Sequence, residues 1–141
     1  MFSQTAEYAL RAVVWLASQH GKPQTTQQIA ATTRVPAGYL SKVLQALGRA
    51  GLVKSQRGLY GGFTLSRPPG KISVLEVVNA VDPIQRIETC PLGLKSHGVE
   101  LCALHKRLDD AIAHIEKAFS TSSIADLLSE PSSKHPLGES E

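Results

Sequence analysis

The chain has 141 residues, with 15 Lys or Arg against 12 Asp or Glu and a formal net charge of +3 at pH 7. This length suits one domain of ordinary size and is too short for two independent hydrophobic cores. Apolar runs are too short for a transmembrane helix, and the N-terminus lacks the pattern of an export signal. We therefore expect a cytoplasmic protein with no membrane partner.

The charges divide the chain into two halves of opposite sign. From Met1 to Lys71 nine Lys or Arg face a single acid, Glu7, whereas the remainder has six bases and eleven acids. The basic half predicts a module that binds phosphate, and the acidic half predicts a sensing or oligomerising module. A solvated surface with uneven charge is the alternative interpretation.

The N-terminal segment predicts two helices. Ala, Leu and Val recur at helical spacing from about Thr5 to His20, and Gly21 stops that helix. Thr25 and Gln28 form a capping box, which opens a short second helix that ends near Thr33.

A third helix follows after a tight turn. Pro36 suits its first position, Gly51 ends it, and the Leu and Val residues between them form one apolar stripe. Two helices joined in this way are typical of DNA-binding helix-turn-helix proteins, in which the second helix enters the major groove. On its polar face we expect base-edge contacts from Tyr39, Ser41, Lys42 and Gln45 and a phosphate contact from Arg49.

Two strand-like segments, Leu52 to Gln56 and Phe63 to Ser66, predict a β-hairpin wing. Glycines in the loop let the backbone approach a sugar-phosphate ridge, and an arginine at the base of such a loop suits the narrow minor groove. Plain turn chemistry and a solvated arginine are the alternatives. We expect the wing to contact phosphates through Lys54, to insert Arg57 into the minor groove and to approach DNA at Gly61 and Gly62.

The back half begins with a short helix and a long loop. Ser73 and Glu76 cap the helix, which ends near Asp82. The following segment, 83–103, shows no periodicity and contains both cysteines of the chain. A loop of this length usually has a function. In a reducing cytosol its cysteines are core residues, redox thiols or metal ligands.

A helix of about sixteen residues within 104–128 carries apolar residues at intervals of three and four, and a short terminal helix completes this segment. The stripe needs a partner, which is either its own domain or the same helix of a second chain. Because helix-turn-helix proteins commonly read two half-sites as dimers, we expect a homodimer on a palindromic operator. Segment 129–141, rich in Ser, Pro and charge, is predicted to be disordered. The expected dimer contacts are Leu104, Leu108, Ala111, Ile112, Ile115 and Phe119.

The predicted fold is therefore mainly α with a small β-hairpin wing. A winged helix-turn-helix DNA-binding domain over 1–82 precedes a cysteine-containing sensor loop and a long C-terminal dimerisation helix. The runs Thr5 to Ala12, Leu47 to Val53, Arg57 to Phe63 and Ile72 to Asp82 closely resemble the Rrf2 family of bacterial transcriptional regulators. This family includes IscR, NsrR and CymR. The resemblance spans about residues 1 to 128 and implies a dimer whose C-terminal helices cross at the interface.

The resemblance also implies a ligand frame in the sensor loop. Cluster-binding members have three cysteines at intervals of six residues, and in IscR a histidine follows three residues after the last cysteine. In this chain the corresponding positions hold Cys90, Ser96, Cys102 and His105. Some members take another ligand from an acidic residue of the partner subunit, at the position of Glu7. We therefore expect a 2Fe-2S iron-sulfur cluster on both cysteines and His105, with Ser96 or the partner's Glu7 as the fourth ligand. Such a cluster makes the protein a sensor of redox state, nitric oxide or cluster status.

Other interpretations stay open because Ser96 replaces a cysteine. Zinc bound by Cys90, His97, Cys102 and His105 has the right number and type of ligands. A thiol switch uses the two cysteines alone, and a regulator that has lost its cofactor uses neither. An enzyme is not expected, since no oxyanion or phosphate-binding loop accompanies the Cys and His residues. A dimeric protein-interaction module without DNA binding is the alternative from another functional class.

Overall fold

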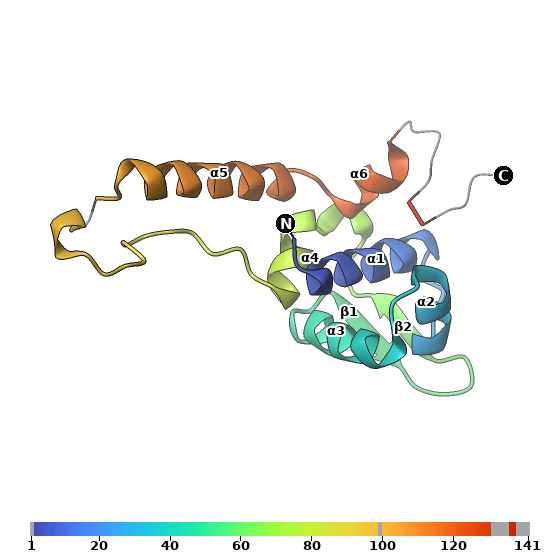
Figure 1. Ribbon diagram of the computed structural model, residues 1–141. Coiled ribbons are helices and arrows are strands. Elements are labelled where there is room, and N and C mark those ends of the chain that lie inside the picture. The colour runs from blue at the N-terminus through green and yellow to red at the C-terminus, as the bar shows by residue number, and fades with distance from the viewer. Residues whose placement is uncertain (1, 99, 131–135, 138–141) are drawn as a thin grey trace.

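A helix-turn-helix and a two-stranded wing form the body of the molecule, and a long arm projects from it (Figure 1). This computed structural model describes residues 2–98, 100–130 and 136–137. The body contains α1 (Gln4–Ser18), α2 (Thr26–Thr33), α3 (Ala37–Arg49), β1 (Val53–Gln56), β2 (Gly62–Leu65), the 3₁₀ turn η1 (Pro69–Lys71) and α4 (Val74–Val81). The arm contains a loop with the turn η2 (Lys95–His97) and then α5 (Ala103–Ser120), and α6 (Ile124–Ser129) returns to the body.

Local sequence signals set the start of each helix in the helix-turn-helix. The N–H of Gln28 donates to Thr25 Oγ1 at 3.1 Å and the N–H of Thr25 donates to Gln28 Oε1 at 2.9 Å, which confirms the capping box. Arg34 ends α2 with a left-handed φ of 59°, which turns the chain toward α3. Pro36 is the N-cap of α3 and not its first residue, because its carbonyl accepts the first helical hydrogen bond, from the N–H of Leu40 at 2.9 Å.

The apolar faces of the helices meet in a single core. The predicted stripe on α3, formed by Leu40, Val43, Leu44 and Leu47, is at most 1% exposed. It packs with buried residues of α1, α2 and α4. Because residues three and four apart lie on one side of a helix, burial of this stripe leaves the opposite side of α3 facing solvent.

The wing is attached to the helix-turn-helix at a second point besides the strands. β1 and β2 pair antiparallel, with Val53 opposite Leu65. The N–H of Phe63 donates to the carbonyl of Gln24 at 2.7 Å, and the N–H of Gln24 donates to the carbonyl of Phe63 at 3.0 Å. Gln24 lies in the connection between α1 and α2, so this pair fixes the position of β2 relative to α2 and α3.

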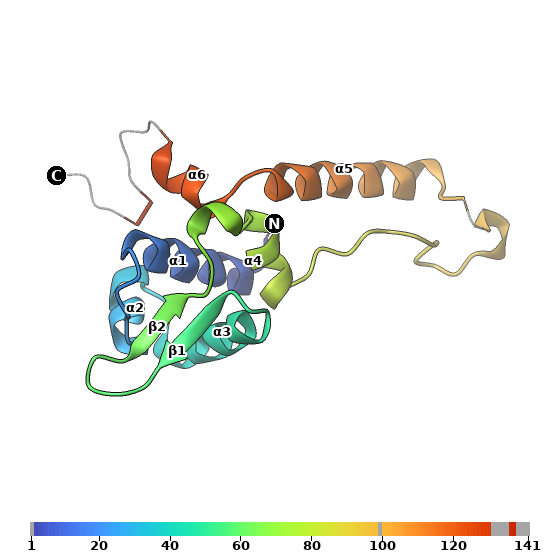
Figure 2. The same ribbon diagram turned by 180° about the vertical axis from the view of Figure 1, so that it is seen from behind.

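Both ends of the arm are anchored at α4. The loop leaves from the C-terminal end of α4, and after α5 the chain returns to the N-terminal end of α4. There the N–H of Ile124 donates to the carbonyl of Ile72 at 2.9 Å, and the N–H of Val74 donates to the carbonyl of Ser122 at 2.9 Å. Figures 1 and 2 show α5 on the side of the body opposite to α3 and the wing. None of the helices in the described part of the chain combines the length and apolar content needed to cross a bilayer.

The element boundaries agree closely with those expected from the sequence. α5 begins at Ala103, one residue before the predicted start of the dimerisation segment, and α6 is the short terminal helix. A capping box between Ser123 and Asp126, which the sequence reasoning missed, starts α6. The disorder predicted for 129–141 falls largely on residues outside those described.

Candidate nucleic-acid interface and cysteine loop

The outward face of α3 presents every side chain predicted for it. Tyr39, Ser41, Lys42, Gln45 and Arg49 are all exposed. The Ser41 hydroxyl donates to the carbonyl of Ala37 at 3.2 Å, one turn earlier in the same helix. The ring of Tyr39 stands edge-on to that of Tyr8, with centroids 5.6 Å apart, so α1 restricts where the Tyr39 ring points.

The wing residues separate into two groups. Lys54 and Arg57 are exposed, as a contact with phosphate or a groove requires. Gly61 and Gly62 are half-buried, and each has a steric reason to be glycine. A Cβ on Gly61 would collide with the Gln56 carbonyl within the hairpin, and one on Gly62 would lie 2.5 Å from the carbonyl carbon of Gln24 in the connection between α1 and α2. A DNA contact at either glycine stays a prediction.

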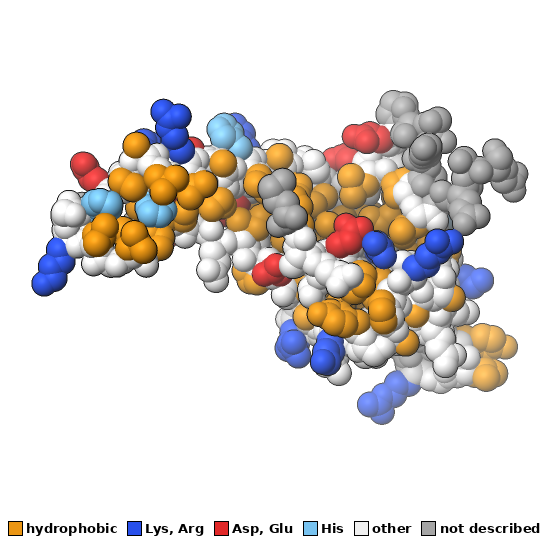
Figure 3. Space-filling view, in the orientation of Figure 1, with side chains coloured by type: hydrophobic (Ala, Val, Ile, Leu, Met, Phe, Trp, Pro, Cys, Tyr) orange, Lys and Arg blue, Asp and Glu red, His pale blue; other side chains and the backbone are white. Residues whose placement is uncertain are grey.

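The surface around α3 and the wing is electrostatically one-sided. The sequence has no Asp or Glu between Glu7 and Glu76. These two carboxylates are engaged by basic residues, Glu7 with Arg11 at 3.1 Å and Glu76 with Arg67 at 2.5 Å, and the latter contact lowers the pKa of Glu76. Figure 3 shows Lys and Arg side chains along the edge of the body that carries α3 and the wing. This surface suits a polyanion.

The cysteine loop brings two of its predicted ligands into contact. Cys102 is the N-cap of α5, and its Sγ lies 3.3 Å from Nδ1 of His105, one turn into the helix. Both side chains are half-buried. Cys90 is also half-buried, in a turn closed by a 2.9 Å hydrogen bond from the N–H of Gly93 to the Cys90 carbonyl, and Ser96 is exposed in η2.

The remaining predicted ligands do not join this pair within one chain. Among the described residues no group of three or more His, Cys, Asp and Glu is arranged to hold a metal ion. Nδ1 of His97 is buried and has no hydrogen-bond partner in the described part of the molecule. Glu7 lies on the body, paired with Arg11. The thiol and imidazole of Cys102 and His105 match iron and zinc in chemical type, so the pair is a partial ligand set that other donors must complete.

An ion-pair network that the sequence reasoning missed joins the loop to α5. Arg86 Nε and Nη2 donate to the two oxygens of Asp109 at 2.7 and 2.8 Å, and Arg86 Nη1 donates to Glu116 at 3.1 Å. The N–H of Ile87 also donates to Asp109 at 2.8 Å. These bonds hold the pKa of Asp109 at about 2, below its ordinary 3.8. The signal in the sequence was two acids seven residues apart, which lie on one side of a helix.

The apolar stripe of α5 is only partly covered by its own chain. No residue of α5, all of which is described, is buried, and Leu104 and Leu108 are 61% and 47% exposed. Ile112 and Ile115 are half-buried, and Ala111 is exposed. Phe119, at the other end, contacts the body: its ring centroid lies 5.2 Å from that of Phe2. The uncovered part of the stripe is therefore the half of α5 nearest the cysteines.

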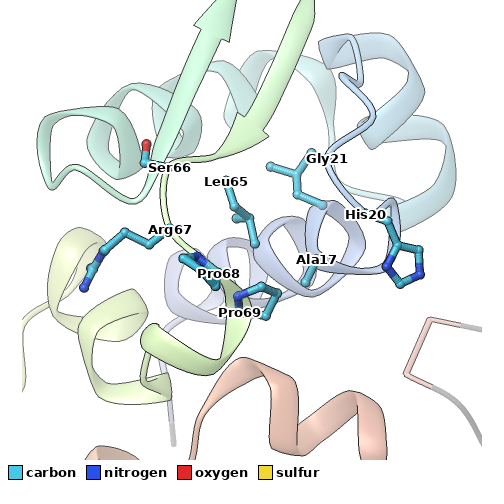
Figure 4. Close-up of a pocket in the computed structure, with 9 residues that line it drawn as sticks. Ala17, His20, Gly21, Leu65, Ser66, Arg67, Pro68 and Pro69 are labelled. Atoms are coloured by element: carbon cyan, nitrogen blue, oxygen red, sulfur yellow. The ribbon is translucent and has the colours of Figure 1, made fainter.

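A cavity of about 370 Å³ lies between the end of α1 and the segment after β2 (Figure 4). Its polar side chains include His20 and Arg67, which lie at opposite ends of the view. Arg67 is engaged by Glu76 and by the carbonyl of Lys71 at 3.1 Å. The guanidinium that this cavity presents is therefore already paired within the chain.

Comparisons with known proteins agree with this geometry. The sequence model of the Rrf2 family, described as an iron-dependent transcriptional regulator, matches residues 2–130. The HTH-type transcriptional regulator CymR of Bacillus subtilis is 35% identical over 88 residues, which cover 61% of this chain and 64% of CymR.

Solved structures extend the likeness over most of the chain. IscR of T. potens has a TM-score of 0.77 at 25% identity, covering 94% of this chain and 88% of that one. CymR (YrzC), the global cysteine regulator of B. subtilis, has a TM-score of 0.74 at 28% identity, covering 94% and 98% of the two chains. The predicted winged-helix architecture and the expectation that the chain is not an enzyme are confirmed. The chain is a DNA-binding transcriptional regulator that belongs to the Rrf2 family.

Proposed function

We propose that the chain is a cytoplasmic homodimer that binds a palindromic operator through α3 and the wing and senses redox state, nitric oxide or iron-sulfur status through its arm. The observation that carries the sensing part is the 3.3 Å contact between Cys102 and His105 at the start of α5. A ligand bound there lies at the end of the helix whose uncovered stripe is available to a second copy. A change at the pair therefore acts on the spacing of two DNA-binding bodies.

The DNA contacts divide by chemistry. Tyr39, Ser41, Lys42 and Gln45 face base edges in the major groove, Arg49 and Lys54 contact phosphates, and Arg57 enters the minor groove. Arg57→Ala should weaken specific binding by about 1–3 kcal/mol. The measurement is DNA affinity across a salt series, with Lys117→Ala on α5 as a control that removes the same charge elsewhere. Equal affinities for Arg57→Ala and the wild type at every salt concentration remove Arg57 from the interface.

The dimer buries the uncovered stripe of α5 against the same helix of the partner, with Leu104, Leu108, Ala111, Ile112, Ile115 and Phe119 as its predicted contacts. Leu108→Asp places a carboxylate in that stripe and should convert the dimer to a monomer, because burying an unpaired charge is costly. Analytical ultracentrifugation measures this, with Leu92→Asp, an exposed leucine of the cysteine loop, as the control. A monomeric wild type contradicts the dimer directly.

The favoured cofactor is a 2Fe-2S cluster held by Cys90, Cys102 and His105, with Ser96 or the partner's Glu7 as the remaining ligand. The family match to an iron-dependent regulator supports iron, and thiolate and imidazole are suitable ligands. When bound, such a cluster supplies one-electron redox chemistry and reactivity toward nitric oxide. The protein's part is to hold the loop against α5 through Arg86 and Asp109, so that the ligands keep their positions relative to the dimer helix.

Anaerobic purification with a visible spectrum and iron, sulfide and zinc analysis on one sample tests this cofactor. Iron and sulfide in equal amounts, lost in Cys102→Ser, support the cluster. Zinc without sulfide instead supports a site that includes His97, whose Nδ1 is buried without a partner among the described residues. Failure to take up either metal after reconstitution leaves the two cysteines as a thiol switch, which a mass shift of Cys90 or Cys102 under oxidant identifies.

A further inference from the structure

The tip of the wing carries the two most exposed large apolar side chains of the described residues. Leu59 is 90% exposed and Tyr60 is 87% exposed, whereas the next, Leu92, is 73% exposed. A single exposed apolar residue needs no explanation, but two adjacent ones at the end of a hairpin form a small apolar surface. Figure 3 shows hydrophobic side chains at the outer end of the wing.

The backbone holds these two side chains outward in a defined turn. The N–H of Gly61 donates to the carbonyl of Gly58 at 3.0 Å, which places Leu59 and Tyr60 at the two central positions of the turn. Gly58 has a φ of +110°, and Gly62, on the other side, has a φ of +147° against the backbone of Gln24. The tip is therefore the end of a hairpin fixed to the helix-turn-helix at its base.

The surroundings of the tip indicate what it contacts. Arg57 precedes the turn and Lys54 lies on β1, and the sequence has no carboxylate from residue 8 to residue 75 that could repel a phosphate. Figures 1 and 2 place the wing on the same side of the body as α3. A body that docks α3 on DNA therefore brings the tip to the duplex as well, beside the major groove that α3 occupies.

We propose that Leu59 and Tyr60 form a wedge that enters the minor groove next to each half-site, partly unstacks one base step and bends the duplex. Apolar side chains inserted from the minor groove act in this way, and an adjacent arginine is attracted to the negative potential of a narrow groove. The wedge rests on the DNA-binding mode proposed above and adds to it. Because pyrimidine–purine steps are the most easily kinked, the wedge favours DNA that has such a step beside the half-site. These steps then belong to the recognised sequence, although no hydrogen bond contacts their bases.

The experiment uses the full-length protein and a duplex enriched from a random library by the wild type. Bending is measured by energy transfer between dyes at the duplex ends, and unstacking by the fluorescence of 2-aminopurine placed at successive steps beside the half-site. For the wild type we expect a bend on the order of 20–90° and a fluorescence rise at one step. Leu59→Ser with Tyr60→Ser should abolish both at saturating protein and weaken binding about tenfold.

Conservative variants and a distant control make the result specific. Leu59→Met with Tyr60→Phe keeps the apolar volume and should retain the bend, whereas Leu92→Ser should leave bend and affinity unchanged. If the variant with both serines bends and binds the duplex as the wild type does, the wedge is overturned, and the proposed DNA binding through α3 is unaffected. A change only in the self-association of the DNA-free protein also overturns it, in favour of a protein partner at the tip. Failure of the wild type to enrich any duplex overturns the DNA-binding mode itself.

Discussion

Replacing Gly62 with alanine tests how the wing is held in place. Gly62 is the first residue of β2, and its φ of +147° is a backbone conformation that residues with a Cβ rarely adopt. A Cβ at this position would also lie 2.5 Å from the carbonyl carbon and oxygen of Gln24. Two effects therefore add at this site. The first is conformational strain at residue 62, and the second is the overlap of its Cβ with the backbone of Gln24, which cannot move away without breaking the hydrogen bonds between Gln24 and Phe63.

The magnitude follows from these two effects. A residue held in a glycine-only region costs about 1–3 kcal/mol. Relieving the overlap breaks the two hydrogen bonds between Gln24 and Phe63, each worth about 1 kcal/mol. Gly62→Ala should therefore lower the free energy of unfolding by about 3–5 kcal/mol.

Gly58→Ala is the matched control, because it isolates the conformational effect. Gly58 also has a positive φ, of +110°, but a Cβ there would meet no described atom within 4 Å. Its cost should be about 1–2 kcal/mol. Urea unfolding of both variants, followed by circular dichroism and by the fluorescence of the single tryptophan, Trp15, gives the two values. Equal destabilisation by the two substitutions would falsify the close approach of Gly62 to Gln24 as the cause.

The remaining predictions concern the arm, a helix cap and the core. Because Arg86 lowers the pKa of Asp109 from 3.8 to about 2, the stability that this pair adds to the arm is complete above pH 3.8 and is lost as the pH falls toward 2. Limited proteolysis at a series of pH values should show the wild-type loop becoming easier to cleave as the pH falls through this range, and Asp109→Asn should remove that dependence. A variant whose cleavage rate changes with pH as the wild type's does contradicts the role of Asp109. Ser73→Ala removes the N-cap of α4 and should cost about 1 kcal/mol in thermal unfolding, and no loss means that the capping box contributes nothing. Leu44→Ala, at a site 1% exposed, should cost about 2–5 kcal/mol, whereas Leu92→Ala should stay within about 0.5 kcal/mol. Similar unfolding midpoints for these two leucine variants contradict the burial of Leu44 in the core.

Sequence reasoning worked best where a signal is local. The capping boxes at Thr25 and Ser73 and the buried stripe of α3 were all predicted, because each depends on residues within one or two helical turns. Burial of that stripe also determined which face of α3 is outward, so the exposed side chains predicted there are confirmed as exposed. Their contacts with DNA stay predictions for the affinity measurements.

The cysteine loop was predicted less completely because it lacks periodicity. Cys102 was expected in the loop, but it is the N-cap of α5, and its Sγ therefore meets Nδ1 of His105 one turn into that helix. Cys90 lies in a segment whose path depends on Arg86 and Asp109, which are 23 residues apart. A contact over such a distance leaves no periodic signal, so the sequence pattern named the candidate ligands without showing which of them would gather.

The order of the helices, most of their caps, the charge asymmetry and the family resemblance could all be predicted from the amino-acid sequence, because they follow from neighbouring residues and from composition. The attachment of the wing to Gln24, the anchoring of the arm on α4 and the uncovered part of the α5 stripe became visible only in the folded chain. The physical reason is that each depends on backbone and side-chain groups distant in sequence, whose meeting is set by how the whole core packs. The apolar tip of the wing shows both contributions: the sequence supplies Leu59 and Tyr60, and the fold exposes them at the end of a wing that lies on the same side of the body as α3.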